Sequence, residues 1–267
     1  MRTLIFDLSN IMYLSGYRQD PLVDNDSAAE EIAERAAVYM RAWYRTFSPD
    51  HFVFACDSSR YWRRELFPDY KGHRVEDTLK KLVKRALKFY KTKHEKNCLE
   101  LDGCEADDVI YALTKHLPGH KVIVSSDKDF EQLMNDQIWL FDPKTQTYRR
   151  PSLQVEFDLF LKCIRGDRGD NIPSAYPRVL TKRLRNIFEC PKERQKMFDQ
   201  VHPLGGKIGE YFLRNQRLID LSFLPEELDQ ILKEKIHTKI YPKELYPKEI
   251  LTQEISHSEI IFSEIQA

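Results

Sequence analysis

The sequence lacks several features that would mark a membrane or exported protein. It has no run of about 18 apolar residues, the length that spans a bilayer as a helix. Its first ten residues, MRTLIFDLSN, reach an acidic residue too early for a signal peptide. Its five cysteines form no CxxC pair, and their odd number argues against a disulfide framework or a zinc site. We therefore expect a cytoplasmic protein with free thiols and no membrane contact.

The sequence also lacks net charge, because 42 Lys and Arg balance 42 Asp and Glu. This balance conceals two basic stretches. Residues 60–96 contain 13 Lys or Arg against 5 Asp or Glu, and residues 162–196 contain 10 against 4. Basic stretches beside acidic clusters indicate a surface for a polyanion around a metal site, although two solvated helix faces would give the same counts.

The first 150 residues alternate short apolar runs with amphipathic segments. The runs predict strands at 3–6, 51–56, 121–124 and 138–141, and the segments predict helices at 27–47, 78–96 and 106–116. This alternation is typical of the α/β class, with a doubly wound, mostly parallel sheet. We expect an α/β core over residues 1–155.

The strand signals fade after residue 151. Residues 156–238 have the pattern of a helical module. Turn-forming sequences at 171–177, 190–191 and 203–206 interrupt it. The last segment, residues 239–267, alternates apolar and polar residues in part. That pattern favours an edge strand over a tail that docks on a partner.

Acidic residues stand where the predicted strands end, and more acids open the predicted helix at 106–116. The first group is Asp7, Asp57, Asp127 and Asp129, and the second is Glu105, Asp107 and Asp108. The carboxyl ends of parallel strands meet at one edge, where so many carboxylates would repel one another unless cations lay between them. One or two acids at a helix start would be ordinary capping. All-oxygen ligands favour Mg²⁺ or Mn²⁺, and two such ions about 4 Å apart are the usual device for phosphoryl displacement.

The stretch DSSRYWRRELFPDYKGHR, residues 57–74, combines cations with aromatic residues. Lys71 and Arg74 are the candidates for contacting the scissile phosphate, with Arg64 as a further cation for nucleic acid. Aromatic rings such as that of Tyr70 can stack on unpaired bases. An amphipathic segment whose aromatic residues only pack would have a similar composition.

Five motifs in order resemble the flap endonucleases and 5′–3′ exonucleases of replication and repair. They are LIFDLSN, FACDSSRYWRRELFPDYKGHR, GCEADDVI, SSDKDFEQL and GDRGDNIP, which together cover most of residues 1–175. The stretch LRNQRLIDLSFLPEEL, residues 213–228, is similar to the bacteriophage branch, which includes the RNase H that removes primers. The resemblance implies a PIN-like nuclease core with a helical arch over about residues 58–96, followed by a C-terminal helical DNA-binding module.

The resemblance also implies roles for individual residues. The catalytic metal ligands would be Asp7, Asp57, Glu105, Asp107 and Asp108, and a second ion would be held by Asp127, Asp129, Asp167 and Asp170. Lys71 and Arg74 would form the basic pair at the base of the arch, and Tyr70 would stack on a terminal base. The implied substrates are branched or nicked DNA, with RNA–DNA hybrids as a further class. Replication proteins, such as a single-strand binding protein or a clamp, would bind through the C-terminal part.

One segment departs from the family pattern. Where relatives have a glycine-rich hairpin, this chain has SAYPRVLTKRL, residues 174–184, without glycine. Glycines allow backbone amides to approach a phosphate closely, so their absence places that contact and its associated K⁺ site in doubt. Arg178, Lys182 and Arg183 are the candidates to hold duplex phosphates through side chains instead, although an exposed helix face would look the same.

Three other functions fit parts of the sequence. A non-catalytic protein that binds DNA junctions on the same scaffold would be favoured by a lost family carboxylate, but every one is present. A phosphatase with an aspartyl nucleophile would want a second acid two residues after Asp7, where Ser9 stands. Adhesion through the doubled Arg-Gly-Asp at 165–170 would require export. The three-residue spacing of Asp167 and Asp170 instead favours two carboxylates near one face of a helical turn. We expect a Mg²⁺-dependent 5′ nuclease, with the junction-binding protein as the alternative.

Overall fold

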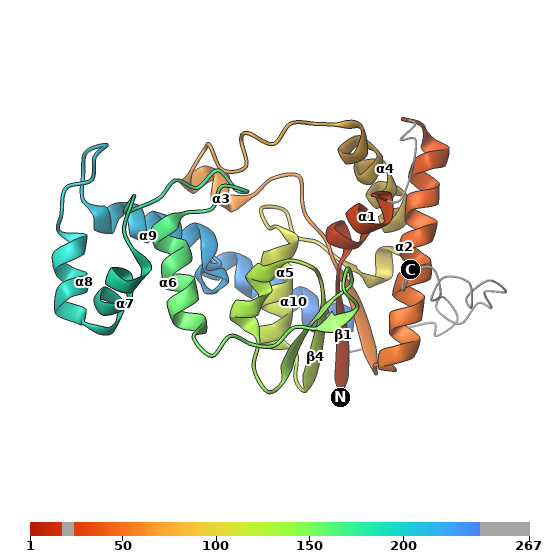
Figure 1. Cartoon of the computed structure of the whole chain (residues 1–267). Coiled ribbons are helices and arrows are strands. Elements are labelled where there is room, and N and C mark those ends of the chain that lie inside the picture. Colours follow the sequence, from red (N-terminus) through yellow and green to blue (C-terminus); the bar gives the residue numbers. More distant parts are fainter. Residues whose placement is uncertain (18–23, 241–267) are drawn as a thin grey trace.

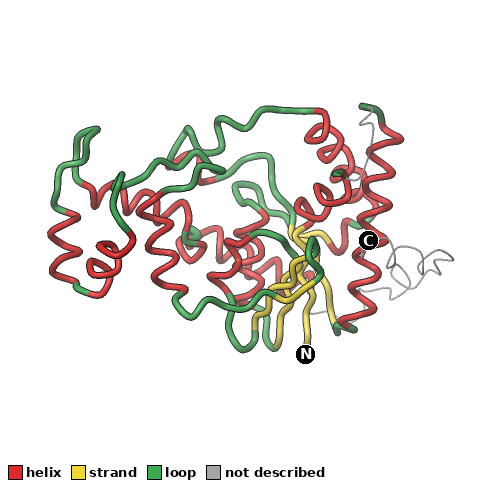
Figure 2. The backbone as a smooth tube through the Cα atoms, in the orientation of Figure 1, coloured by secondary structure: helices red, strands yellow, loops and turns green. Residues whose placement is uncertain are grey.

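A six-stranded sheet lies at the centre of the protein, in a computed structural model that describes residues 1–17 and 24–240 (Figures 1 and 2). Its strands are β1 (Arg2–Asp7), β2 (His51–Ala55), β3 (Cys98–Leu99), β4 (His120–Val124), β5 (Ile138–Asp142) and β6 (Thr147–Tyr148). Their order is β3-β2-β1-β4-β5-β6, and every neighbouring pair is parallel except β5 and β6. The predicted mostly parallel α/β sheet is confirmed. Strands β3 and β6 were not predicted, because two residues are too few to give a periodic signal.

Helices cover both faces of the sheet (Figure 1). One face carries α1 (Leu8–Gly16), α2 (Asp26–Phe47) and α4 (Thr78–Lys93), and the other carries α5 (Ala106–His116) and α10 (Glu226–Ile240). The predicted helices at 27–47 and 106–116 correspond to α2 and α5. The one predicted at 78–96 ends at Lys93 and is followed by the 3₁₀ turn η1 (Glu95–Asn97). Helix α1 was not predicted, because it follows β1 without any intervening loop.

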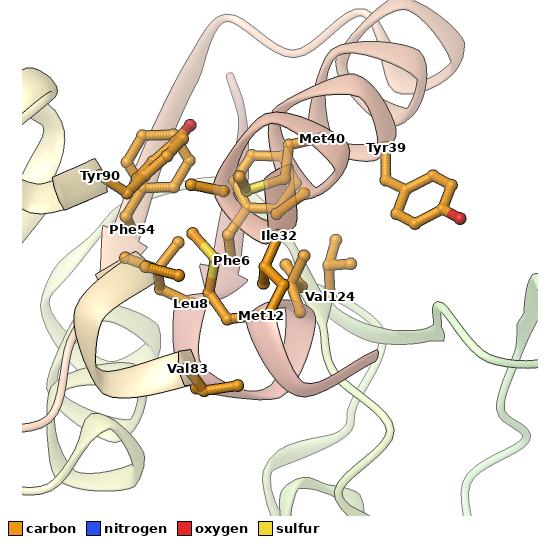
Figure 3. Close-up of a cluster of buried hydrophobic side chains, with 14 of the residues drawn as sticks. Phe6, Leu8, Met12, Ile32, Tyr39, Met40, Phe54, Val83, Tyr90 and Val124 are labelled. Atoms are coloured by element: carbon orange, nitrogen blue, oxygen red, sulfur yellow. The ribbon is translucent and has the colours of Figure 1, made fainter. Parts of the chain in front are cut away.

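Successive residues of the central strands point to opposite faces of the sheet. In β1, Leu4 and Phe6 belong to the apolar cluster under α2 and α4, whereas Ile5 belongs to the cluster under α5. Figure 3 shows Phe6 beside Phe54 of β2, with their ring centroids 5.5 Å apart, and Met40 of α2 in the same cluster. Because both faces are buried, the strands read as continuous apolar runs rather than as alternating patterns.

A third apolar cluster lies outside the sheet, at the end of the molecule away from α2 and α4 (Figure 1). It is formed mainly by α6 (Val155–Arg165), α7 (Thr181–Glu189), α8 (Pro191–Phe198) and α9 (Ile208–Ile219). Asn215 of α9 is fully buried, and its amide donates to the carbonyl oxygens of Cys163 at 2.9 Å and Pro173 at 2.8 Å. This side chain therefore ties the end of α6 and the segment that follows it to α9.

The last described helix packs on the sheet core rather than on the helical cluster. Leu232 and Ile236 of α10 are buried in the cluster under α5. Asp229 accepts from Lys115 of α5 at 2.8 Å and lies 2.8 Å from the ring of His116. The limits of the helical module, expected at 156–238, stay a prediction. The expected edge element lies beyond Ile240 and so outside the described residues.

The connection between β2 and α4 carries the short helix α3 (Trp62–Leu66) and crosses the carboxyl ends of the strands (Figure 1). All five cysteines are free thiols, as expected, and four of them are buried. Among the described residues, no helix is both long and apolar enough to cross a membrane.

Gly166 caps the end of α6 in a conformation that a side chain cannot enter. Its φ is +73°, and an added Cβ would lie 2.2 Å from the carbonyl oxygen of Ile172. We expect Gly166→Ala to lower the free energy of unfolding by about 2–3 kcal/mol, because it adds a backbone clash to an unfavourable φ. Urea denaturation measures the loss.

Gly205 supplies the matched control for this substitution. Its φ is +89°, and no heavy atom lies within 4 Å of an added Cβ. Gly205→Ala should therefore cost only the conformational part, about 1 kcal/mol. Equal losses in the two variants would contradict the steric explanation for Gly166.

Candidate active site

A cavity of about 990 Å³ lies between the carboxyl ends of the strands and the connection that crosses them. Five of the predicted metal ligands line it: Asp7, Asp57, Glu105, Asp107 and Asp127. The connection and α4 contribute the cations Arg64, Lys71, Arg74, Lys80, Lys84, Lys88 and Lys91. The cavity thus has an acidic side made by strand and helix ends and a basic side made by the arch region, residues 58–96.

Asp7 is both the last residue of β1 and the N-cap of α1. Its Oδ1 accepts from the backbone N–H of Asn10 at 3.1 Å, and its Oδ2 accepts from the hydroxyl of Ser125 at 2.7 Å. Burial, together with the charge of Asp57, raises the pKa of Asp7 to about 7. The chain therefore fixes this carboxylate in place while leaving its charge poorly compensated.

Asp57 follows β2 and connects two helix starts. Its Oδ1 accepts from the backbone N–H of Ala106 at 2.9 Å, and its Oδ2 accepts from the hydroxyl of Ser9 at 2.5 Å. Ser9, the residue that argued against a phosphatase, thus orients the carboxylate of Asp57. The side chain is aligned with the N-terminus of α5, where a negative charge is favoured.

Asp107 and Asp127 lie on the acidic side of the cavity. Asp107 is in the first turn of α5, and burial raises its pKa well above the usual range. The ammonium group of Lys71 opposes that rise, and the charge of Asp127 adds to it. Asp127 caps the 3₁₀ turn η2 (Lys128–Leu133) by accepting from the backbone N–H of Asp129 at 2.8 Å. Both side chains therefore belong to the acidic side of the cavity.

Glu105 is buried at the N-cap of α5, and three donors surround its carboxylate. Its Oε1 accepts from Lys71 Nζ at 2.5 Å, and its Oε2 accepts from Tyr70 Oη at 2.9 Å and Arg63 Nη1 at 3.1 Å. Burial alone would raise the pKa of Glu105, but the charges of Lys71 and Arg63 outweigh burial and lower it. Glu105 is thus an ionised acceptor that holds Lys71 at the cavity.

Asp108 does not reach the cavity, contrary to the expectation that it would be a metal ligand. It is fully buried, and its Oδ2 accepts from Arg63 Nη1 at 2.8 Å and from the backbone N–H of Glu105 at 2.9 Å. Arg63 also donates through Nε to the carbonyl oxygen of Leu218 at 3.0 Å. Asp108 therefore joins α3, α5 and α9 through Arg63 and its Oδ2, while its buried Oδ1 has no hydrogen-bond partner.

The four carboxylates expected to hold a second ion are not gathered at one point. Lys162 Nζ lies between Asp129 and Asp167; it contacts Asp129 Oδ1 and lies 2.9 Å from Asp167 Oδ2. Asp170 instead accepts from Arg74 Nη2 at 2.6 Å. Only the fourth member, Asp127, lines the cavity. In this structure an ammonium group stands where the expected arrangement has a metal ion.

The acidic side of the cavity nevertheless fits a hard divalent cation. Within residues 1–17 and 24–240, no three acidic, histidine or cysteine side chains are already arranged to hold an ion. The available donors are all oxygen atoms, which Mg²⁺ and Mn²⁺ prefer. The raised pKa values of Asp7 and Asp107 show that the chain's own cations leave their charges only partly compensated. Asp7, Asp57, Asp107 and Asp127 would hold such an ion.

The residues expected to contact nucleic acid have different surroundings. Tyr70 is only 2% exposed and donates to Glu105, so its ring is not open to a stacked base, contrary to expectation. Arg64 lines the cavity with its guanidinium 5.4 Å from the ring centroid of Tyr61. Arg178, Lys182 and Arg183 are all exposed, before and at the start of α7. Their position suits side-chain contacts to a backbone phosphate.

Several residues of the site were not found from the sequence. They are Ser9, Asn10, Arg63, Ser125 and Lys162. Each acts on a carboxylate by a hydrogen bond or ion pair that depends on tertiary packing. The lysines of α4 did give a signal, because Lys80, Lys84, Lys88 and Lys91 recur at helical spacing along one face.

A comparison with protein families shows which family the chain belongs to. The model of the 5′–3′ exonuclease N-terminal, resolvase-like domain matches residues 2–158. The chain belongs to the 5′–3′ exonuclease family. This is a family of metal-dependent nucleases, in agreement with the resemblance read from the five motifs.

Curated relatives extend the likeness beyond that domain. The flap endonuclease Xni of Shewanella halifaxensis is 28% identical over 229 residues, which is 80% of this chain and 89% of that protein. The flap endonuclease Xni of Shewanella baltica strain OS195 is 28% identical over 234 residues, which is 81% of this chain and 87% of that protein. The relatives therefore match both the core and much of the helical part.

Solved structures share the fold. The bacteriophage T5 flap endonuclease, in a pseudo-enzyme-product complex with DNA and metal ions, has a TM-score of 0.64 at 23% identity, covering 95% of this chain and 100% of that one. The T5 5′-exonuclease with bound zinc has a TM-score of 0.66 at 20% identity, covering 90% and 99%. The shared fold thus extends over the helical module as well as the sheet.

The raised pKa of Asp7 predicts how the metal-free protein responds to pH. Its pKa in the folded protein is about 7 against an ordinary 3.8, so the folded state binds the proton more tightly than the unfolded state does. Stability should therefore fall as the pH rises from about 4 to about 7. Asp7→Asn should remove the loss of stability that comes from ionising Asp7. It should therefore raise the free energy of unfolding at pH 8 by about 1–2 kcal/mol.

Urea denaturation of both proteins at pH 5 and pH 8, in the presence of a chelator, measures this difference. Adding Mg²⁺ at pH 8 should stabilise the wild type more than Asp7→Asn, because the ion binds the folded carboxylates. The same pH dependence of stability in the two proteins would show that the pKa of Asp7 is not raised by folding.

Proposed function

We propose that the protein is a divalent-metal-dependent, structure-specific 5′ nuclease that hydrolyses phosphodiester bonds near 5′ ends of branched or nicked DNA. The observation that supports this most strongly is the cavity itself, in which five carboxylates face the cations of the arch region. Carboxylates alone would bind an ion, and cations alone would bind a phosphate. Their meeting in one cavity suits a reaction in which a metal ion acts on a phosphate.

The carboxylates would hold Mg²⁺ or Mn²⁺. We propose that two ions bind. A bound ion supplies Lewis-acid stabilisation of the charge that develops on the phosphate. Asp7 and Asp107 are the principal ligands in this proposal, because burial and neighbouring carboxylates raise their pKa values and a cation would offset that cost. A second ion at Asp129 and Asp167 would have to displace Lys162, which now bridges them.

The cations would bind and orient the nucleic acid. Lys71 and Arg74 lie on the basic side of the cavity, where they can hold the scissile phosphate opposite the carboxylates. Lys80, Lys84 and Lys88 of α4 line the same cavity and can follow the backbone of a single strand. Arg178, Lys182 and Arg183 would contact the phosphates of a duplex, which makes binding sensitive to salt.

The relatives support the choice of DNA as substrate. The matched Xni proteins are named flap endonucleases, and the T5 enzyme was crystallised with DNA and metal ions. RNA–DNA hybrids as a further substrate, replication proteins as partners and a cytoplasmic location belong to the same proposal. They stay predictions.

A cleavage assay with a 5′-flap DNA and a nicked RNA–DNA hybrid tests the proposal, with Mg²⁺ and with a chelator. Wild-type protein should cut only with the metal. Asp107→Asn should lower the single-turnover rate by about a thousandfold or more, because it removes a principal ligand, while affinity for the flap changes less than about threefold. A wild-type protein that binds both substrates but cuts neither would be the non-catalytic junction-binding alternative.

Lys71→Ala tests the assignment of the scissile-phosphate contact. It should slow cleavage by about a hundredfold and weaken binding much less, because Lys71 acts on one phosphate among many contacts. Lys144→Ala is the control, since Lys144 is an exposed lysine in the turn after β5 and does not line the cavity. A Lys71→Ala protein that cuts at the Lys144→Ala rate would remove Lys71 from the site.

A further inference from the structure

Two turns that are distant in the sequence lock together beside the cavity. The arch-base turn, residues 67–74, meets the RGD loop, residues 165–172. The backbone N–H of Lys71 donates to the carbonyl oxygen of Asp170 at 2.8 Å. In return, the side-chain amide of Asn171 donates through Nδ2 to the carbonyl oxygen of Asp69 at 2.9 Å. These two hydrogen bonds run in opposite directions and flank Tyr70.

The two residues that form this lock have unusual backbone conformations. Lys71 has a φ of 55° and Asn171 has a φ of 60°, and neither is a glycine. Asparagine tolerates the left-handed region, whereas a lysine there is uncommon and persists only where its surroundings hold it. Two hydrogen bonds hold Lys71 in this conformation. One runs from its own N–H to Asp170, and the other runs from the side chain of Asn171 to the carbonyl oxygen of Asp69.

The conformation of Lys71 bears on the site because its side chain ends at the carboxylate of Glu105. Lys71 Nζ lies 2.5 Å from Glu105 Oε1, inside the cavity. A change of φ at Lys71 would change the direction of its Cα–Cβ bond and so move the ammonium group. The backbone lock therefore sets where this ammonium group lies relative to the acidic side of the cavity.

The RGD loop is itself firmly fixed, so it can act as the fixed partner of the lock. The backbone N–H of Asp167 donates to the carbonyl oxygen of Ile172 at 2.9 Å, and that of Ile172 donates back at 2.7 Å. Gly166 packs directly under this pair, and Asn215 holds the carbonyl of Pro173 that follows. The loop thus connects the arch-base turn to the helical module.

We propose that Asn171 is a positioning residue that acts through Lys71: its amide holds the arch-base turn on the RGD loop and so keeps the Lys71 ammonium at Glu105. The inference rests on the proposed nuclease function and deepens it. Asn171 itself is exposed and does not line the cavity, so it acts on the rate through Lys71 and not through contact with the reacting phosphate.

Asn171→Gly isolates the hydrogen bond from the backbone conformation, because glycine adopts a positive φ readily. We expect its single-turnover cleavage of the 5′-flap DNA to be about tenfold slower, since a small misplacement of a phosphate-binding group is costly. Affinity for the flap and the melting temperature should stay close to the wild-type values. Gln146→Gly is the matched control, because Gln146 has a φ of 56° in a turn that does not line the cavity.

A second comparison separates positioning from a general structural role. In a Lys71→Ala background, Asn171→Gly should cause no further loss of rate, because the group that it positions is gone. Hydrogen exchange gives a readout that does not depend on activity. The amide of Lys71 should exchange faster in Asn171→Gly than in the wild type or in Gln146→Gly, since the turn that carries this amide is no longer held at Asp69 against its acceptor, the carbonyl oxygen of Asp170.

The outcomes distinguish this inference from the proposed function. A wild-type protein that does not cleave refutes the nuclease, and unchanged exchange at Lys71 in Asn171→Gly then refutes the lock independently. If the wild type cleaves, then a wild-type rate in Asn171→Gly overturns the role of Asn171 alone. The same tenfold loss in the Lys71→Ala background would also overturn it, because Asn171 would then act by another route.

Discussion

Repulsion between carboxylates is the constraint on which the arrangement of this protein depends. A parallel sheet brings the acids at its strand ends to one edge, and α5 adds more. Internal cations compensate some of them: Arg63 and Lys71 keep Glu105 ionised, and Lys162 bridges Asp129 and Asp167. The remaining charge is concentrated at the cavity, where a divalent cation would relieve it. In the proposed function, the same charge that destabilises the metal-free fold would favour metal binding.

The basic side of the cavity is not an independent element. On this side, the side chain of Lys71 donates to Glu105 and its backbone N–H donates to the carbonyl oxygen of Asp170. Arg74 is fixed by Asp170 as well. The helical module, the arch region and the acidic side are therefore joined by a few polar contacts. A displacement of the module would be transmitted through these contacts to Lys71.

The sequence predicted the sheet and the acids at its strand ends, because the carboxyl ends of parallel strands must meet at one edge whatever the loops do. It did not predict which carboxylates form ion pairs with cations from distant segments. Asp108 turns to Arg63, and no pattern in the sequence links those two positions. The three-residue spacing of Asp167 and Asp170 suggested one face of a helical turn, but the chain forms a bridged loop that sends them to different cations. Pair geometry of this kind depends on tertiary packing and not on local periodicity.

We propose above that the uncompensated charge around Asp7 and Asp107 binds a divalent cation. Anomalous X-ray scattering from crystals of the protein grown with Mn²⁺ measures this directly. We expect a manganese peak at about 2.2 Å from carboxylate oxygens of both residues, the usual distance for oxygen ligands of such ions. Manganese bound only between Asp129 and Asp167, or absent from the cavity at a saturating concentration, would contradict it.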